Sequence, residues 1–339
     1  MTELWAPGVS SGSREPFNDH SEIVEITPAE RDLGEMTLRF FRTNIQRAPL
    51  WSIDFKNRMT VINRPLRGER RVQLPYERSD STSYPQLRLE ALEQEEISPY
   101  LVRDLLYKKD TEDFLPDFTR HSKALFRNLW GITRAYDQWG YEEGQHSDVL
   151  EIILESQGYS RDELFSRYFD NLSQTWELPF TTPRQITAYA AFQEGSTQPS
   201  YQAAAERADK EDAPVTAELL RLIGRDEGYH WASYIGFLRI FFGADPEGTI
   251  GDTIHVARQF RMPAINLIPE HAKGFVNAMR LGTYTPDMET EAIYSTLVSF
   301  GFIGKKLARQ TADEHRDLIL ATTSLRNHLP GNLNPTPAR

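Results

Sequence analysis

The chain has 339 residues, with 49 acidic against 38 basic side chains and a formal net charge of -11. Hydrophobic residues make up 39% of it, so the composition excludes a disordered or collagen-like chain, and the length is ample for a sizeable core. There is no cysteine, which excludes disulfides, thiolate zinc sites and an iron–sulfur cluster of its own. The acidic balance disfavours a nucleic-acid binder, because such proteins neutralise phosphates with a basic surface.

The first part of the chain carries few regular patterns. Residues 1–28 are polar and rich in Ser, Gly and Pro, which predicts a loosely held arm without an apolar signal core. Thr27 is a candidate helix cap, and a helix is expected from about Pro28 to Arg47. The Pro-interrupted, Arg-rich stretch 58–84 predicts an irregular basic loop.

Helical patterns dominate the rest of the chain. A ligand-bearing bundle is expected over about residues 97–243, and further helices over 246–330. The sequence therefore predicts one domain over residues 29–329, with a disordered tail at 330–339. The most apolar stretch, Tyr234–Phe242, is short and contains an arginine, so no membrane span is expected and a cytoplasmic protein is the default.

Two Glu-x-x-His motifs occur in this helical region, at Glu143–His146 and at Glu227–His230. One copy alone is weak, because such a pair also suits a solvent-facing helix. Here each copy belongs to a mostly apolar run spaced three and four apart, which is typical of an inward-facing helix seam. The seams are Ile132, Tyr136, Trp139, Glu143, His146, Leu150 and Ile153, and Leu220, Ile223, Glu227, His230, Tyr234, Phe237 and Phe241.

Buried carboxylates require protonation, an opposite charge or a metal ion, and two such pairs favour a shared metal site. Carboxylate oxygen and imidazole nitrogen suit iron or manganese. Helix bundles hold two such ions with one Glu from each of two helices and Glu-x-x-His from two others. Glu194 and Glu112 are the candidate single glutamates, although Asp113 and Glu142 lie close enough in sequence to be confused with the true ligands.

With these residues the chain resembles the soluble acyl-carrier-protein fatty-acid desaturases, a branch of the ferritin-like di-iron proteins, over about residues 100–290. An ordered set of segments carries the resemblance, and no single segment would suffice. The segments are Thr111-Glu112-Asp113-Phe114-Leu115-Pro116, Glu142-Glu143-Gly144-Gln145-His146, Phe192-Gln193-Glu194 with Thr197, Asp226-Glu227-Gly228-Tyr229-His230, Asp245 to Thr249, Met262 to Ala264, and Arg280 to Thr285.

The resemblance implies an all-α fold, namely a ferritin-like four-helix bundle with extra N- and C-terminal helices. It also implies two iron ions per chain, bridged by Glu143 and Glu227. The full set of implied ligands is Glu112, Glu143, His146, Glu194, Glu227 and His230. By the same resemblance Thr197 would lie on the O2-binding side, and Asp226 would orient His146 on an electron route that starts at Trp51.

The implied activity is O2-dependent introduction of a cis double bond into a fatty acyl chain carried on acyl carrier protein. The chain has neither cysteine nor a GxGxxG nucleotide motif, so its electrons must come from a partner such as ferredoxin. A homodimer is expected by resemblance alone. No nucleic acid is expected among the partners.

Departures from the family pattern leave other functions open. Gly144 and Gly228 each follow a motif glutamate, Pro199 should kink the helix one turn after Glu194, and Tyr201 stands where a His is common. A di-iron oxygenase that hydroxylates another carrier-bound or free chain is therefore an alternative. A non-catalytic ferritin-like iron binder is a second one.

Two further sets of residues belong to the predicted site. An acyl channel needs an apolar wall, although ordinary core packing explains aromatic residues equally well. The candidates for that wall are Phe114, Phe118, Trp139, Tyr189 and Phe192. An acidic carrier protein needs a basic docking patch, although solvated surface charge is the plainer interpretation. The candidates for docking are Arg64, Arg67, Arg70 and Arg71, or Arg258 and Arg261.

Overall fold

The computed structural model of the chain describes residues 27–41, 61–64, 70–73, 89–265, 267–268, 270–299 and 303–322. This part is helical apart from one short β-ribbon, so the predicted all-α class is confirmed. The helices are α1 (Pro28–Phe40), α2 (Leu89–Leu92), α3 (Pro99–Glu112), α4 (Leu115–Leu125), α5 (Trp130–Ser156), α6 (Arg161–Leu172), α7 (Pro183–Lys210), α8 (Pro214–Ala244), α9 (Pro246–Gln259), α10 (His271–Leu281), α11 (Pro286–Ser299) and α12 (Lys305–Thr322). Trp51, Arg67 and the tail 330–339 lie outside the described residues, as does the predicted arm up to residue 26.

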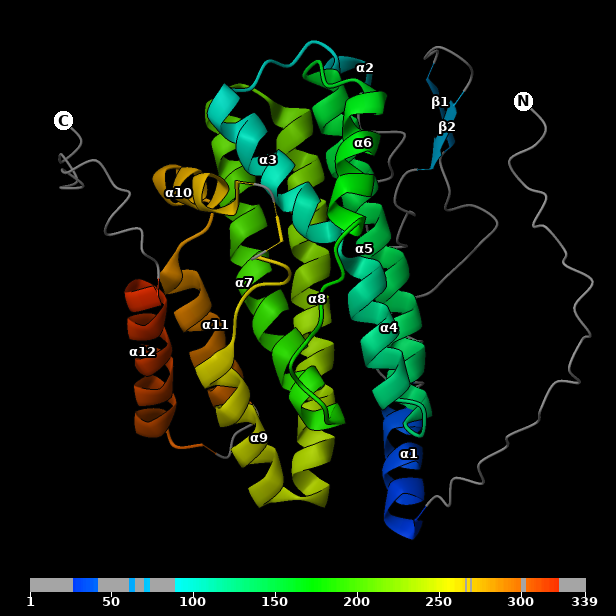
Figure 1. Cartoon of the computed structure of the whole chain (residues 1–339), viewed down its shortest axis with the longest axis vertical. Coiled ribbons are helices and arrows are strands. Elements are labelled where there is room, and N and C mark those ends of the chain that lie inside the picture. The colour runs from blue at the N-terminus through cyan, green and yellow to red at the C-terminus, as the bar shows by residue number, and fades with distance from the viewer. Residues whose placement is uncertain are drawn as a thin grey trace, which may run out of the picture.

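Four long helices, α3, α5, α7 and α8, form the centre of the molecule (Figure 1). Helix α3 packs along α5, α7 packs along α8, and contacts between α5 and α8 and between α3 and α7 close the bundle. The remaining helices cover it. Helices α1 and α4 lie against α5, α9 and α11 lie against α7, and α12 packs on α11 and α9.

Side-chain caps and prolines fix where two of the central helices, α3 and α7, begin. The Ser98 hydroxyl accepts a hydrogen bond from the Leu101 N–H, and Pro99 opens α3. Thr182 caps α7 in the same way, ahead of Pro183. Serine and threonine satisfy free N–H groups at helix starts, and proline suits the first helical position because it has no N–H to satisfy. Helix α7 then runs through Pro199 to Lys210.

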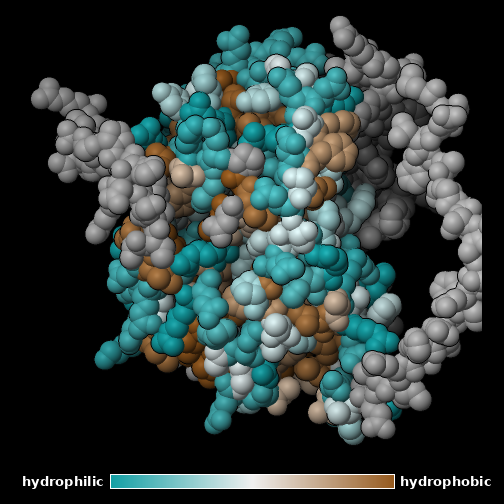
Figure 2. All heavy atoms as spheres, in the orientation of Figure 1, coloured by the Kyte–Doolittle hydropathy of each residue, from teal (hydrophilic) through white to brown (hydrophobic). Residues whose placement is uncertain are grey.

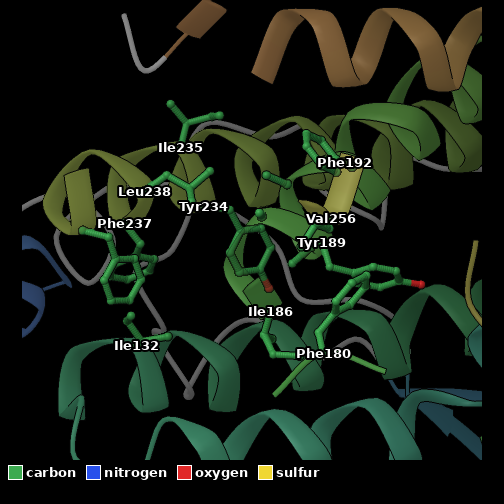
Figure 3. Packing of buried hydrophobic residues seen from close by; sticks show 14 of the residues in the cluster. Ile132, Phe180, Ile186, Tyr189, Phe192, Tyr234, Ile235, Phe237, Leu238 and Val256 are labelled. Atoms are coloured by element: carbon green, nitrogen blue, oxygen red, sulfur yellow. The ribbon is translucent and has the colours of Figure 1, made fainter. Parts of the chain in front are cut away.

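The predicted seams of α5 and α8 face the core. All their residues are buried, and none is more than 3% exposed. Figure 3 shows part of this hydrophobic core, where Ile132 of α5 points toward Phe237 of α8 and Tyr189 lies beside Phe180. The polar members of each seam are therefore enclosed by apolar neighbours above and below them.

The prediction of an irregular loop over residues 58–84 is wrong for two segments of it. Strands β1 (Val61–Arg64) and β2 (Arg70–Gln73) pair antiparallel, with Val61 opposite Gln73. The β-branched residues Val61, Ile62 and Val72 favour strands, a signal that the surrounding arginines and prolines obscured. The ribbon's backbone carries Arg64, Arg70 and Arg71.

The outer surface of the described helices is mostly polar. Figure 2 shows one face, on which scattered apolar patches interrupt the hydrophilic surface. None of the helices in the described ranges combines the length and the apolar character needed to cross a membrane.

Candidate metal centre

The four central helices bring the six predicted ligands together. Glu112 is the last residue of α3, Glu194 comes from α7, and the two motif pairs come from α5 and α8. They form two groups of donors, each with ligand atoms within 4.8 Å of one another. The groups are Glu112, Glu143, His146 and Glu227, and Glu143, Glu194, Glu227 and His230. Glu143 and Glu227 belong to both groups.

Both imidazoles direct the same ring nitrogen into this centre. His230 Nδ1 lies 2.9 Å from Glu143 Oε1 and 3.5 Å from both Glu194 Oε2 and Glu227 Oε2. His146 Nδ1 lies 3.4 Å from Glu143 Oε2 and 3.8 Å from Glu227 Oε1. The two ring centroids are 5.9 Å apart.

The opposite nitrogen of each ring meets a second carboxylate. His230 Nε2 lies 2.9 Å from Glu142 Oε2, and His146 Nε2 lies 3.3 Å from Asp226 Oδ2. A carboxylate accepts, so each Nε2–H donates, and a cation that displaces the other ring proton would meet the Nδ1 lone pair. The arrangement is reciprocal, because Glu142 of α5 orients the α8 histidine and Asp226 of α8 orients the α5 histidine.

Each single glutamate is held by one aromatic donor. Trp139 Nε1 donates to Glu194 Oε1 at 2.9 Å, and the Tyr201 hydroxyl donates to Glu112 Oε1 at 2.7 Å. Asp113 points elsewhere, because Lys109 Nζ donates to both of its oxygens at 2.8 and 2.9 Å. The structure therefore brings Glu112 to the centre and leaves Asp113 in an ion pair.

The buried carboxylates of the centre favour binding of a proton or a cation. Burial, together with the charges of Glu143 and Glu227, raises the pKa of Glu112 well above its usual value. Burial and the charges of Glu143 and Glu194 raise the pKa of Glu227 in the same way. Burial lowers the pKa of His146, but the carboxylates of Glu143, Asp226 and Glu227 together outweigh it and raise that pKa well above its usual value. Four carboxylates are too many for two imidazoles, so protons or cations must complete the balance.

The donor set fits a pair of divalent ions. Among the described residues, the buried atoms without a hydrogen-bond partner include four that belong to the proposed ligands, namely Glu143 Oε1, His146 Nδ1, Glu194 Oε2 and Glu227 Oε2. Buried polar atoms normally have such a partner, and these four converge on one place. Carboxylate oxygens with imidazole nitrogens suit iron or manganese, and four carboxylates neutralise two divalent cations.

Two spaces adjoin the centre, and the candidate channel residues divide between them. A cavity of about 30 Å³ touches Glu112, Glu143 and Glu227 and is also lined by Thr197, Phe114, Phe118 and Trp139. A groove of about 350 Å³ lies next to it, with exposed Glu177 and Gln259 at its rim and Tyr189 in its wall. Trp176 and Met262 line both spaces and so separate them. Phe192 lines neither and packs against Phe260 in the core.

The remaining predicted residues lie around this region. Thr197 Oγ1 donates to the backbone oxygens of Gln193 and Glu194, both at 3.2 Å, so the hydroxyl is held on its own helix. Arg261 lines the groove, and its guanidinium donates to the Phe260 carbonyl. Arg258 is exposed and pairs with Glu314.

Sequence reasoning missed two of these roles. The sequence pattern offers Glu142 only as a competitor of the ligands, yet it precedes Glu143 as Asp226 precedes Glu227, and this parallel indicates its pairing with His230. Trp176 had no detectable signal, because it lies between α6 and α7 and reaches the site only through tertiary packing. Its ring stacks on Phe118, with centroids 5.7 Å apart.

Residues 74–328 match the family described as fatty acid desaturase, which covers all four helices of the centre. No curated protein is similar enough to the chain to register as a match. Since the match spans most of the sequence, the chain belongs to the fatty acid desaturase family.

Proposed function

We propose that this protein is an O2-dependent di-iron desaturase, which introduces a cis double bond into a fatty acyl chain carried on acyl carrier protein. One observation carries the proposal: within a desaturase-family chain, two donor groups share Glu143 and Glu227. Two glutamates common to both groups suit two adjacent ions better than one. Glu112 and His146 would complete one half of the site, and Glu194 and His230 the other.

The reaction removes two hydrogens from adjacent methylenes and, with O2, two electrons and two protons, gives an alkene and two waters. A bound iron pair supplies the oxygen activation that attack on an unactivated C–H bond requires. Glu142 and Asp226 orient the two histidines and hold their Nε2 protons. The buried seams of α5 and α8 exclude bulk water from the centre.

The groove and the small cavity give the acyl chain a route. The groove has the size of a small-molecule site, whereas the cavity holds little more than a water molecule. An alkyl chain therefore reaches the centre only when the Trp176 or Met262 side chain moves aside. Methionine is flexible enough for such movement. Phe118 and Trp139 would then flank the chain beside the ligands.

Partners follow from the same chemistry. The sequence has no cysteine, so an external carrier such as ferredoxin would supply the two electrons. An acidic acyl carrier protein would dock at Arg258 and Arg261, since Arg261 lines the groove that leads inward. We further propose a homodimer, by resemblance to the acyl-carrier-protein desaturases.

Product analysis tests this function. The purified protein, loaded with Fe²⁺, would receive saturated acyl chains on acyl carrier protein, O2, and reduced ferredoxin. Loss of two mass units from the acyl chain supports desaturation. A gain of sixteen mass units would instead identify an oxygenase, and tight binding of iron without turnover of any chain would identify an iron-binding protein.

A further inference from the structure

Glu112 is the least restrained of the proposed ligands. It is the last residue of α3, where the regular helix ends, and its side chain is only partly buried. The other five lie inside helices and are at most 2% exposed. A carboxylate at a helix end needs an added contact to keep one orientation.

Tyr201 supplies that contact from the neighbouring helix. Its hydroxyl donates to Glu112 Oε1 at 2.7 Å, and its side chain is 2% exposed. Lys108 of α3 fixes the approach of the two helices, because its Nζ donates to Ser200 Oγ at 2.6 Å and lies 5.5 Å from the Tyr201 ring centroid. On the far side, Gly224 of α8 leaves room, since a Cβ there would lie 3.2 Å from Tyr201 Cβ.

Trp139 holds the other half of the centre in the same way. It donates to Glu194 Oε1, and Glu194 Oε2 is left without a hydrogen bond, 3.5 Å from His230 Nδ1. One oxygen of each single glutamate is thus occupied by an aromatic donor, which leaves the other oxygen for a cation. The two donors differ in chemistry, because one is a phenol and the other an indole.

We propose that Tyr201 is a positioning residue of the metal centre, which sets the cation affinity of the Glu112–His146 half by holding Glu112 in one orientation. The proposal rests on the metal centre of the proposed function, but not on the identity of the substrate. It assigns a role to a tyrosine at a position where the resembling desaturases commonly have histidine.

Anaerobic titration of the metal-free protein with Co²⁺ and with Fe²⁺, followed by visible absorption and calorimetry, tests the role without turnover. Wild-type protein should take up two ions. The variant Tyr201→Phe should bind one ion as wild type does and the other about 10- to 100-fold more weakly, which is the usual effect of losing a group that orients a ligand. In a Glu112→Ala background, Tyr201→Phe should change nothing further.

The matched control is Tyr234→Phe. Tyr234 is equally buried, and no hydrogen bond joins its hydroxyl to a proposed ligand among the described residues. This variant should bind both ions as wild type does. Equal weakening of both ions in Tyr201→Phe, unchanged binding of both, or an added loss in the Glu112→Ala background would each overturn the proposal.

A folding failure of Tyr201→Phe, detected by thermal melting, would move the test to Tyr201→His, which keeps an N–H donor. Two ions bound with near wild-type affinity would then support the role, and loss of the second ion would refute it. Different outcomes would refute the proposed function. Wild-type protein that binds no ions refutes the metal centre itself, whereas two bound ions without a desaturated product refute the activity and leave the role of Tyr201 standing.

Discussion

Glu143 and Glu227 differ from the other proposed ligands because each belongs to both donor groups. A shared carboxylate can hold both cations at once, whereas Glu112 and Glu194 can each serve only one. Removing a shared residue should therefore have a different consequence from removing a single one. The four glutamates are buried together, and some of their oxygens have no hydrogen-bond partner. Removing a shared or a single glutamate therefore also reduces the repulsion between carboxylates in the metal-free protein.

We expect Glu143→Ala or Glu227→Ala to abolish binding of two ions, and Glu112→Ala or Glu194→Ala to leave one ion bound. Metal content per chain, measured after anaerobic loading with Fe²⁺ and gel filtration, distinguishes the two outcomes. Glu142→Gln is the control on the same helix, and it should keep two ions with about 10- to 100-fold lower affinity. Two ions retained by Glu143→Ala would refute the shared role.

At this scale the sequence predicts which residues meet but not how they are held. The spacing of the α5 and α8 seams placed both Glu-x-x-His pairs inside, because a helical period fixes a face. The choice between Glu112 and Asp113 depends on how α3 ends. The contacts that Tyr201, Trp139 and Glu142 make depend on how separate helices approach one another, and a linear pattern does not specify this.

Among the elements, α1 depends on one close contact with α5. A Cβ added at Gly131 would lie 2.1 Å from the backbone carbon and oxygen of Thr37, so the two helices touch backbone to backbone there. Only a residue without a side chain allows this approach. Thr37 is itself fully buried.

Gly131→Ala should destabilise the protein by about 1–3 kcal/mol, because α1 must move away or the core must distort. Thermal melting should show this as a lower Tm. Gly251→Ala is the matched control in α9, where a Cβ would meet nothing within 4 Å. That variant should be neutral or up to about 1 kcal/mol more stable, since alanine favours helix. Equal Tm changes in both variants would contradict the close-contact argument.

Helix α10 contributes a pH-dependent contact with α3. The Tyr107 hydroxyl lies 2.8 Å from His271 Nδ1 and donates to the neutral ring. Burial lowers the pKa of His271 from its usual 6.5, although the charge of Glu289 opposes this. The folded protein therefore takes up this proton at a lower pH than the unfolded chain does.

Stability from the neutral ring is fully present above pH 6.5 and is lost as the pH falls from 6.5 through the lower, folded-state pKa. The difference in melting temperature between wild type and His271→Gln, measured from neutral to mildly acidic pH, should shrink as the pH falls. A difference that grows toward acidic pH would show that the ring is held charged instead.

Helices with a regular spacing of inward-facing residues can be predicted from the sequence, whereas the β-ribbon cannot. The long helices α5, α7 and α8 carry unbroken spacing of three and four, and α7 and α8 begin at prolines, so the sequence alone predicts these helices. Strands β1 and β2 are four residues each, too short for alternation to stand out among arginines. Pairing between strands, which is a tertiary contact, defines them.

At the scale of the whole molecule, the net negative charge opposes the docking of an acidic carrier protein that the proposed function requires. The protein carries a net charge of -11, and an acidic carrier would be repelled by it at long range. Local cations beside the groove can reverse that repulsion at short range. Arg261 lines the groove, and Arg258, three residues earlier in the chain, is exposed and pairs with Glu314.

The charge-reversal variants Arg258→Glu and Arg261→Glu should each weaken binding of acyl carrier protein by about two- to fivefold at low salt, as expected for exposed ion pairs. The loss should diminish as ionic strength rises, because salt screens such contacts. Calorimetry over a range of salt concentrations measures both effects. Arg134→Glu, an exposed arginine of α5 outside the groove, is the matched control. Wild-type affinity that does not change with salt, or an equal loss in the control, would move the docking surface away from the groove.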